Sequence, residues 1–401
     1  MHNNPLTFFR LHTILKSNSS QNLHLLEDVA MQVSEMLKER KLPELLSREE
    51  MIKILLDEQY GYVPDIPYEI TVSEPVLVEN RYCDKAVHHS TVQFTVTTQY
   101  GSHTIPVQQI IHVDGTVNPF FIFLNFRPDI PDRYFPTEEV ADGGFDVITA
   151  FYKDITSDDD DYSNGLAKIF YPNGRQQGDD ASKIALWAWF CSRMLDYAAT
   201  LPALDMKQAA VIGHSRLGKT ALLAGMLDER FRYTFSNDSG CSGAALARGN
   251  TGNPGQKIMD TMEGIFDYER DLTTGESIRD IVKCFPQFSC RNYHKYAMTN
   301  VPTDFDQHFL VAAIAPRFAY IASASRDIWA DQVSEFLCGV AASEAYEKMG
   351  YRGLVHNEKL PEIGEFFHEG RIGYHFTKGP HFLSRRDWQK YMAFIRKHQL
   401  D

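Results

Sequence analysis

The spacing of apolar residues along the chain changes twice, and each spacing predicts a different element. Residues 23–41 and 47–64 carry apolar side chains three and four positions apart, which is the spacing of one helix face. The second segment begins with Ser47 and has Glu50 three residues later, as in a capping box. We therefore expect residues 1–65 to form a helical lead-in to the rest of the chain.

After residue 66 the period of the pattern becomes two. Apolar and polar residues alternate, and Val, Ile and Thr are frequent, in the segments 68–80, 91–100 and 104–113. This alternation is typical of antiparallel strands that have one buried and one solvated face.

The later apolar runs are short and continuous, as expected for parallel strands that are covered on both faces. They occupy residues 119–126, 145–152, 209–215, 233–240 and 318–325. Helical patterns alternate with them at 179–200, 219–230 and 384–398. This order predicts an α/β fold with a doubly wound, mostly parallel sheet, antiparallel N-terminal strands and helices on both faces.

No linker rich in Pro, Gly and Ser divides the remainder of the chain. We expect residues 66–401 to form a single catalytic domain, with a polar insertion at 247–275 and a loop at 352–371.

Charge and hydropathy exclude several classes of protein. The 401 residues carry a formal net charge of −13, which disfavours binding to nucleic acid or to an anionic membrane. No apolar run approaches the roughly 20 residues that span a bilayer. The first 20 residues lack the apolar core of a secretory signal, so we expect a cytoplasmic protein, or a secreted one whose signal lies outside this sequence. The sequence predicts no oligomeric state.

The cysteines form no metal-binding pattern. Neither a CxxC pair nor a ladder of His and Cys occurs, so we expect no zinc site and mostly buried thiols. A bridge from Cys241 to Cys290 or to Cys284 is the alternative. The six cysteines are Cys83, Cys191, Cys241, Cys284, Cys290 and Cys338.

A serine lies in a glycine-rich turn between a predicted strand and a predicted helix. The motif is Gly213-x-Ser215-x-x-Gly218. In α/β-hydrolases such a turn lifts the nucleophilic hydroxyl above the sheet edge, and the N–H groups at the start of the next helix can bind an oxyanion. The same letters, GHSRLGKT, also match a phosphate-binding loop, G-x-x-x-x-G-K-[ST].

The order of elements favours the hydrolase interpretation. A phosphate-binding loop is expected after the first strand of its sheet, but here several strands precede it. A hydrolase requires an acid after a later strand and then a histidine near the C-terminus. Asp327 follows the strand at 318–325, and His381 lies in a turn before the last helix, with His375 as its main rival. His214, His294, His308 and His368 are expected to be structural.

These motifs resemble those of one enzyme family. GHSRLGK resembles the G-x-S-R-x-G-K signature of carbohydrate esterase family 15, the glucuronoyl esterases, and SNDSGCSGAAL, IASASRDIWAD and GYHFTKGPH resemble its other conserved segments, over roughly residues 40–400. The resemblance implies an α/β-hydrolase fold and cleavage of the ester that joins a glucuronic acid on xylan to an alcohol on lignin. It implies no metal and no organic cofactor.

The resemblance also implies a role for each matching residue. Ser215 corresponds to the nucleophile, His381 to the base and Arg216 to a donor of the oxyanion hole. Two acids match positions used in the family, Asp238 and Asp327. The implied sugar-binding residues are Lys219, Glu276 and Trp329.

Structural alternatives remain open for several of these residues. Arg216 is also suited to an ion pair with Asp238, Lys219 to a solvated helix face and Trp329 to the core. We expect Asp327 to orient His381, because it follows the late strand as in other hydrolases. The run Asp158–Asp161 is interpreted as a solvated loop rather than a metal site.

The sequence thus predicts a serine-dependent ester hydrolase whose substrate is a carbohydrate ester, foremost a 4-O-methyl-glucuronoyl ester carried by a xylo-oligosaccharide. An acetyl xylan esterase is the first alternative. An inactive sugar-binding protein on a hydrolase scaffold is the second.

Overall fold

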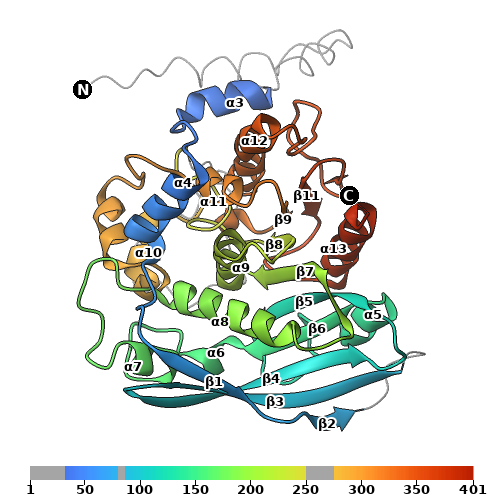
Figure 1. Cartoon of the computed structure of the whole chain (residues 1–401). Helices are drawn as coiled ribbons and strands as arrows, with labels where there is room; N and C mark the ends of the chain where they lie inside the picture. Colours follow the sequence, from blue (N-terminus) through green and yellow to red (C-terminus); the bar gives the residue numbers. More distant parts are fainter. Residues whose placement is uncertain (1–31, 80–85, 250–274, 401) are drawn as a thin grey trace, which may run out of the picture.

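The computed structural model describes residues 32–79, 86–249 and 275–400, and these residues contain one eleven-stranded sheet (Figure 1). Ten strands lie in the order β1-β3-β4-β6-β5-β7-β8-β9-β11-β10, and β2 pairs with β3. The predicted α/β fold with antiparallel N-terminal strands is confirmed.

Six neighbouring strands are parallel and form the centre of the sheet. Their residues are almost all buried, which explains why their sequences read as continuous apolar runs. The six strands are β6 (Asp146–Phe151), β5 (Asn118–Asn125), β7 (Leu204–His214), β8 (Tyr233–Asn237), β9 (Phe318–Ala324) and β11 (Ile372–Thr377). The sequence did not predict β11, because its Gly and His residues interrupt the apolar pattern.

Antiparallel strands extend both edges of the sheet. On one edge, β4 pairs antiparallel with β6, and on the other edge β10 pairs with β11. Buried and exposed positions alternate along much of β3, as the period of two predicts. These strands are β1 (Tyr68–Val72), β2 (Val76–Glu79), β3 (Val87–Thr98), β4 (Gly101–His112) and β10 (Phe366–Phe367).

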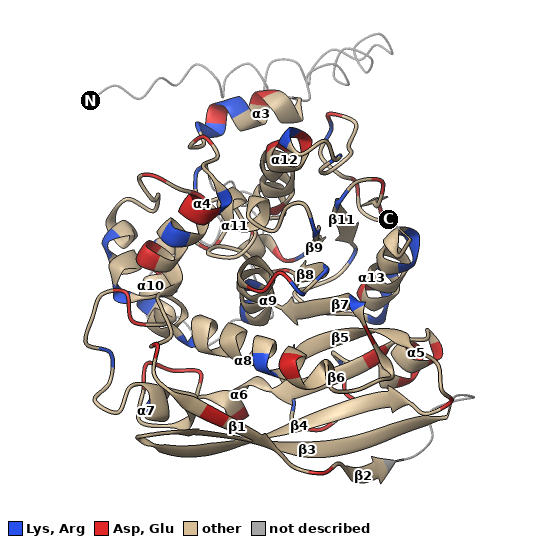
Figure 2. Ribbon diagram, in the orientation of Figure 1, with Lys and Arg blue, Asp and Glu red and all other residues tan. Residues whose placement is uncertain are grey.

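Helices cover both faces of the sheet (Figure 1). On one face, α8 (Lys183–Ala198), α9 (Arg216–Leu227) and α12 (Gln332–Lys348) share the larger hydrophobic core. On the other, α5 (Thr137–Asp142) and α13 (Arg385–His398) pack against the smaller one. Figure 2 shows charged residues of both signs along the ribbons of the outer helices and none on β5 or β8. No helix in the described part of the chain is long and apolar enough to cross a membrane.

Short helices complete the structure and connect the main elements. The N-terminal pair, α3 (Val33–Arg40) and α4 (Arg48–Leu55), contributes Val33 and Leu55 to the larger core, so the described lead-in packs on the same body as the sheet. A boundary at residue 65 stays a prediction. The remaining short helices are η1 (Leu56–Tyr60), α6 (Tyr152–Ile155), α7 (Gly165–Phe170), α10 (Ile278–Cys284), η2 (Pro286–Phe288), η3 (Arg291–Met298), α11 (His308–Ala312) and η4 (Ile328–Ala330).

The structure describes five of the six cysteines and little of the expected insertion. The alternative of a bridge from Cys241 to Cys290 or Cys284 is wrong, because all three are free thiols. Most of the expected insertion at 247–275 lies outside the described residues, as does Cys83.

Candidate active site

Ser215 lies in a sharp turn between β7 and α9. Its backbone has φ 57° and ψ −129°, which is unusual for a residue with a side chain. The turn requires glycine at position 213, where a Cβ would lie 1.9 Å from the carbonyl oxygen of Leu217. A Cβ on Gly218 would make a tight contact of 3.1 Å with the Cβ of Ser239. The hydroxyl-bearing residue is therefore held at the start of α9, where the first N–H groups have no acceptor within the helix.

His381 faces the same cavity from the loop between β11 and α13. Its Nδ1 lies 2.5 Å from Oδ2 of Asp327, which follows β9. The side chain of Asp327 is 3% exposed and that of His381 is 27% exposed. The buried carboxylate thus holds one ring nitrogen and leaves the other nitrogen for the cavity that Ser215 lines.

Asp238, the second candidate acid, lies close to this pair without binding the imidazole in the same way. Carboxylate oxygens of Asp238 and Asp327 and a ring nitrogen of His381 all lie within 4.8 Å of one another. Oδ2 of Asp238 accepts the N–H of Phe382, 3.3 Å away. Burial, followed by the charges of Asp327 and Glu335, raises the pKa of Asp238 well above its usual value.

A second imidazole ring, that of His214, packs against the candidate base. The centroids of His214 and His381 are 4.4 Å apart, and Nδ1 of His214 lies 2.6 Å from Oδ1 of Asn237. Burial is the main cause that lowers the pKa of His214 well below its usual value, so the ring is neutral. The sequence analysis treated His214 as structural and did not anticipate this contact, although its position directly before Ser215 places it in the same turn.

Arg216 is held by an acid that the sequence analysis did not connect with it. Its guanidinium forms an ion pair with Asp158, not with Asp238, so the alternative of an Arg216–Asp238 pair is wrong. The guanidinium also lies over the rings of Phe285 and Phe288, at 5.2 and 4.9 Å from their centroids. These contacts fix the cation beside the nucleophile.

The interpretation of Asp158–Asp161 as a solvated loop is wrong for Asp158, whose side chain is 5% exposed and also accepts the hydroxyl of Tyr152. Asp160 pairs with Arg175 and remains 48% exposed, as the interpretation predicts. Neighbouring carboxylates are tolerated here because each side chain has its own donor.

Lys219 is buried rather than solvated, and it connects the two sides of the cavity. Its ammonium donates to the carbonyl oxygens of Ser239 and Cys241, and Oε2 of Glu276 lies 3.4 Å away. Burial raises the pKa of Glu276, against the opposing effects of Lys219 and of a hydrogen bond from Trp329. Trp329 lines the cavity at 8% exposure, so it is mostly covered but not sealed in the core.

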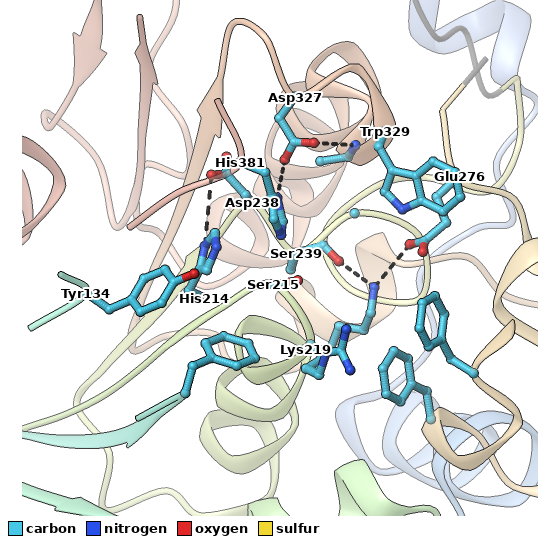
Figure 3. Close-up of a pocket in the computed structure, with 16 residues that line it drawn as sticks. Tyr134, His214, Ser215, Lys219, Asp238, Ser239, Glu276, Asp327, Trp329 and His381 are labelled. Carbon is cyan, nitrogen blue, oxygen red and sulfur yellow. Dashed lines mark hydrogen bonds and ion pairs between the residues drawn. The ribbon is translucent and has the colours of Figure 1, made fainter. Parts of the chain in front are cut away.

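All eight predicted site residues line one cavity of about 220 Å³ (Figure 3). Lys219, Glu276 and Trp329 lie at one end of it, while His214 and Tyr134 lie at the other, with Ser215 and His381 between them. Phe126 and Tyr134 were missed by the sequence analysis, because nothing in their local pattern separates them from core aromatics. His375 does not line the cavity and pairs with Asp387 instead.

Comparisons with known proteins show which family this chain resembles. Residues 85–350, more than half of the chain, match the family described as "Glucuronyl esterase, fungi". A carbohydrate esterase from an unknown prokaryotic organism is 36% identical over 263 residues, which are 65% of this chain and 55% of that protein. A 4-O-methyl-glucuronoyl methylesterase of Hypocrea jecorina is 26% identical over 75% of this chain and 57% of its own length. The match therefore spans little more than half of these relatives.

Solved structures share the whole fold. A promiscuous esterase of carbohydrate esterase family 15 from a marine bacterial metagenome aligns with a TM-score of 0.73 and 27% identity, over 90% of this chain and 99% of its own. A glucuronoyl esterase from Solibacter usitatus aligns with the same TM-score and 25% identity, over 87% of this chain and 91% of its own.

The contact between His381 and Asp327 generates a prediction about the two acids. Asp327→Asn should lower kcat for ester hydrolysis by up to about 10⁴, because an amide favours the wrong imidazole tautomer. Asp238→Asn should cost far less, because Asp238 does not hold Nδ1. Steady-state kinetics of both variants test this, and a larger loss in Asp238→Asn would reverse the assignment.

The raised pKa of Asp238 predicts how its replacement affects stability. A raised pKa means that the folded protein holds the proton more tightly than the unfolded chain does. The corresponding stabilisation is complete below about pH 4 and is lost as the pH rises. The unfolding temperature of Asp238→Asn, relative to that of the parent, should therefore rise as the pH increases.

Thermal unfolding of both proteins between about pH 4.5 and pH 8 measures this gain. The exposed residue Asp129 supplies a matched control, and Asp129→Asn should show little change at either end. A gain for Asp238→Asn that is constant or shrinks with pH contradicts the expectation.

Proposed function

Because the chain belongs to the glucuronyl esterase family, we propose that it is a serine esterase that hydrolyses an ester of a glucuronic acid carried by a xylo-oligosaccharide. The observation that carries the proposal is the cavity in which Ser215, His381 and the Lys219–Glu276 pair face one another. The names of the relatives support the same substrate class.

The first half of the reaction forms an acyl-enzyme on Ser215. His381 removes the proton of the serine hydroxyl as the oxygen attacks the ester carbonyl, and Asp327 stabilises the imidazolium through Nδ1. Negative charge then develops on the carbonyl oxygen beside the N-terminus of α9 and the guanidinium of Arg216. His381 gives its proton to the departing alcohol, and the same residue activates water for the second half.

The sugar carboxyl group enters as the acyl part, so the ring hydroxyls lie near the charged end of the cavity. The 3.4 Å contact between Lys219 and Glu276 is long for a hydrogen bond. A sugar hydroxyl that donates to Glu276 and accepts from Lys219 would replace it with two shorter bonds. Trp329 offers an aromatic surface beside this position.

The alternative of an acetyl xylan esterase lacks a comparable observation. In an acetyl ester the sugar is the alcohol part, so the acyl part brings no hydroxyl to the Lys219–Glu276 pair.

The proposal is tested with Ser215→Ala and two substrates. The parent should hydrolyse benzyl glucuronate with a higher kcat/KM than an acetylated xylo-oligosaccharide, and Ser215→Ala should lose both activities while its circular dichroism spectrum is unchanged. Near-parental turnover by a folded Ser215→Ala variant refutes a serine mechanism. A preference for the acetylated substrate favours the acetyl esterase.

Glu276→Gln tests recognition of the sugar. The variant keeps the shape of the side chain and loses its charge, and charged hydrogen bonds exceed neutral ones by about 1.4 kcal/mol, or roughly tenfold. We expect kcat/KM to fall about tenfold for benzyl glucuronate and to change little for phenyl acetate, which carries no sugar. Equal losses on both substrates would assign Glu276 a structural role only.

A further inference from the structure

The position of His381 depends on the path of the loop at 378–384, which connects β11 to α13. Three contacts hold the middle of this loop against the ends of neighbouring strands. Nδ1 of His381 binds Asp327, the N–H of Arg326 donates to the carbonyl of Gly379 at 2.8 Å, and the N–H of Phe382 donates to Asp238 at 3.3 Å. The loop can satisfy all three only if its two ends are correctly spaced.

A buried hydrogen bond joins these two ends. Nε2 of His375, in β11, lies 2.8 Å from Oδ1 of Asp387, in the first turn of α13, and the side chains are 3% and 0% exposed. Oδ2 of Asp387 accepts the N–H of Ser384, the last loop residue, at 2.6 Å. One carboxylate therefore contacts the strand before the loop and the residue that closes it. In Figure 1, β11 and α13 lie next to each other at this edge of the fold.

The pair is itself fixed from the opposite side. The hydroxyl of Tyr320, in β9, lies 3.1 Å from Nδ1 of His375 and 2.7 Å from Nε2 of His368. A fully buried carboxylate is costly unless its hydrogen bonds are kept, so this arrangement resists small shifts that purely apolar packing would allow. Directional hydrogen bonds thus connect β11 to α13 and to β9 at this position.

We propose that His375 and Asp387 are positioning residues for the hydrolysis, because their contact sets the place of His381 relative to Ser215. The inference rests on the proposed function, in which His381 is the base. A role in core stability alone is the competing explanation, and it makes different predictions about the kinetics.

The chain contains a matched control for this test. His112, at the end of β4, and Asp146, at the start of β6, form a second buried pair, with Nδ1 and Oδ1 2.6 Å apart and side chains 2% and 0% exposed. Neither residue lines the active-site cavity. Replacing this pair should lower stability without moving His381.

The experiment compares His375→Leu, Asp387→Asn and His112→Leu with the parent, at a temperature where circular dichroism shows each to be folded. We expect kcat for benzyl glucuronate to fall about 10- to 100-fold in the first two variants with KM nearly unchanged, because a misplacement of about 1 Å costs up to roughly 100-fold. His112→Leu should lose unfolding temperature and keep its kcat. His375→Gln, whose amide can still donate to Asp387, should recover most of the lost rate.

A double-mutant cycle separates positioning from a general loss of packing. If His375 and Asp387 act through the orientation of His381, Asp387→Asn should cost little in a chain that already carries Asp327→Asn. Equal losses in both backgrounds overturn the proposal, and so does a kcat of the folded single variants that stays within twofold of the parent. If His375→Leu does not fold, the test relies on Asp387→Asn, which is the mildest of these changes.

Failure of this inference and failure of the proposed function give different results. An active parent whose His375 and Asp387 variants keep their kcat removes the positioning role only. A Ser215→Ala variant that remains active removes the serine mechanism itself.

Discussion

The close approach of α9 to the end of β7 is the constraint on which the rest of the active site depends. With only hydrogen atoms on Gly213, the chain can reverse direction within one residue and leave Ser215 at the N-terminus of the helix. The N–H of Ser215 donates to the carbonyl of Asn237, so this turn is also tied to the end of β8. Ser215 and the segment that contains Asp238 are therefore joined by one backbone contact.

Two buried ionisable side chains, Lys219 and Glu335, hold the segment after β8 from two sides. Lys219 binds the carbonyl oxygens of Ser239 and Cys241, and Glu335 of α12 accepts the N–H of Gly240 and the hydroxyl of Ser323. Burial raises the pKa of Glu335 to about 8. The wall of the cavity therefore consists of polar groups that already have hydrogen-bond partners. Such groups keep a defined geometry, because a buried polar group that loses its hydrogen bond raises the free energy of the folded state.

Features that depend on the local residue pattern, or on the order of elements along the chain, were predictable from sequence. The central strands were recognisable because both faces of each are buried, and Ser215 was recognisable from the small residues that its turn requires. Asp327 and His381 followed from the order of elements, since acids and bases of this fold come after particular strands. Their roles were suggested further by a family resemblance.

Contacts between residues that are far apart in the sequence could not be predicted from such patterns. Asp158 lies 58 positions before Arg216, and its setting among other acids suggested solvent rather than an ion pair. α12 was not predicted because it contacts α3, α11, β9 and β11 and so has no single apolar stripe. In both cases the environment that determines the structure is created only when remote parts of the chain meet.

The four central acid–base groups come from the ends of four adjacent parallel strands: Ser215 follows β7, Asp238 follows β8, Asp327 follows β9 and His381 follows β11. The strands also follow one another in this order along the chain. During synthesis, a ribosome that has passed Asp327, in the turn after β9, has made Ser215 and both acids but not His381. The growing chain therefore cannot bring these four residues together until the last strand of the parallel series joins the sheet.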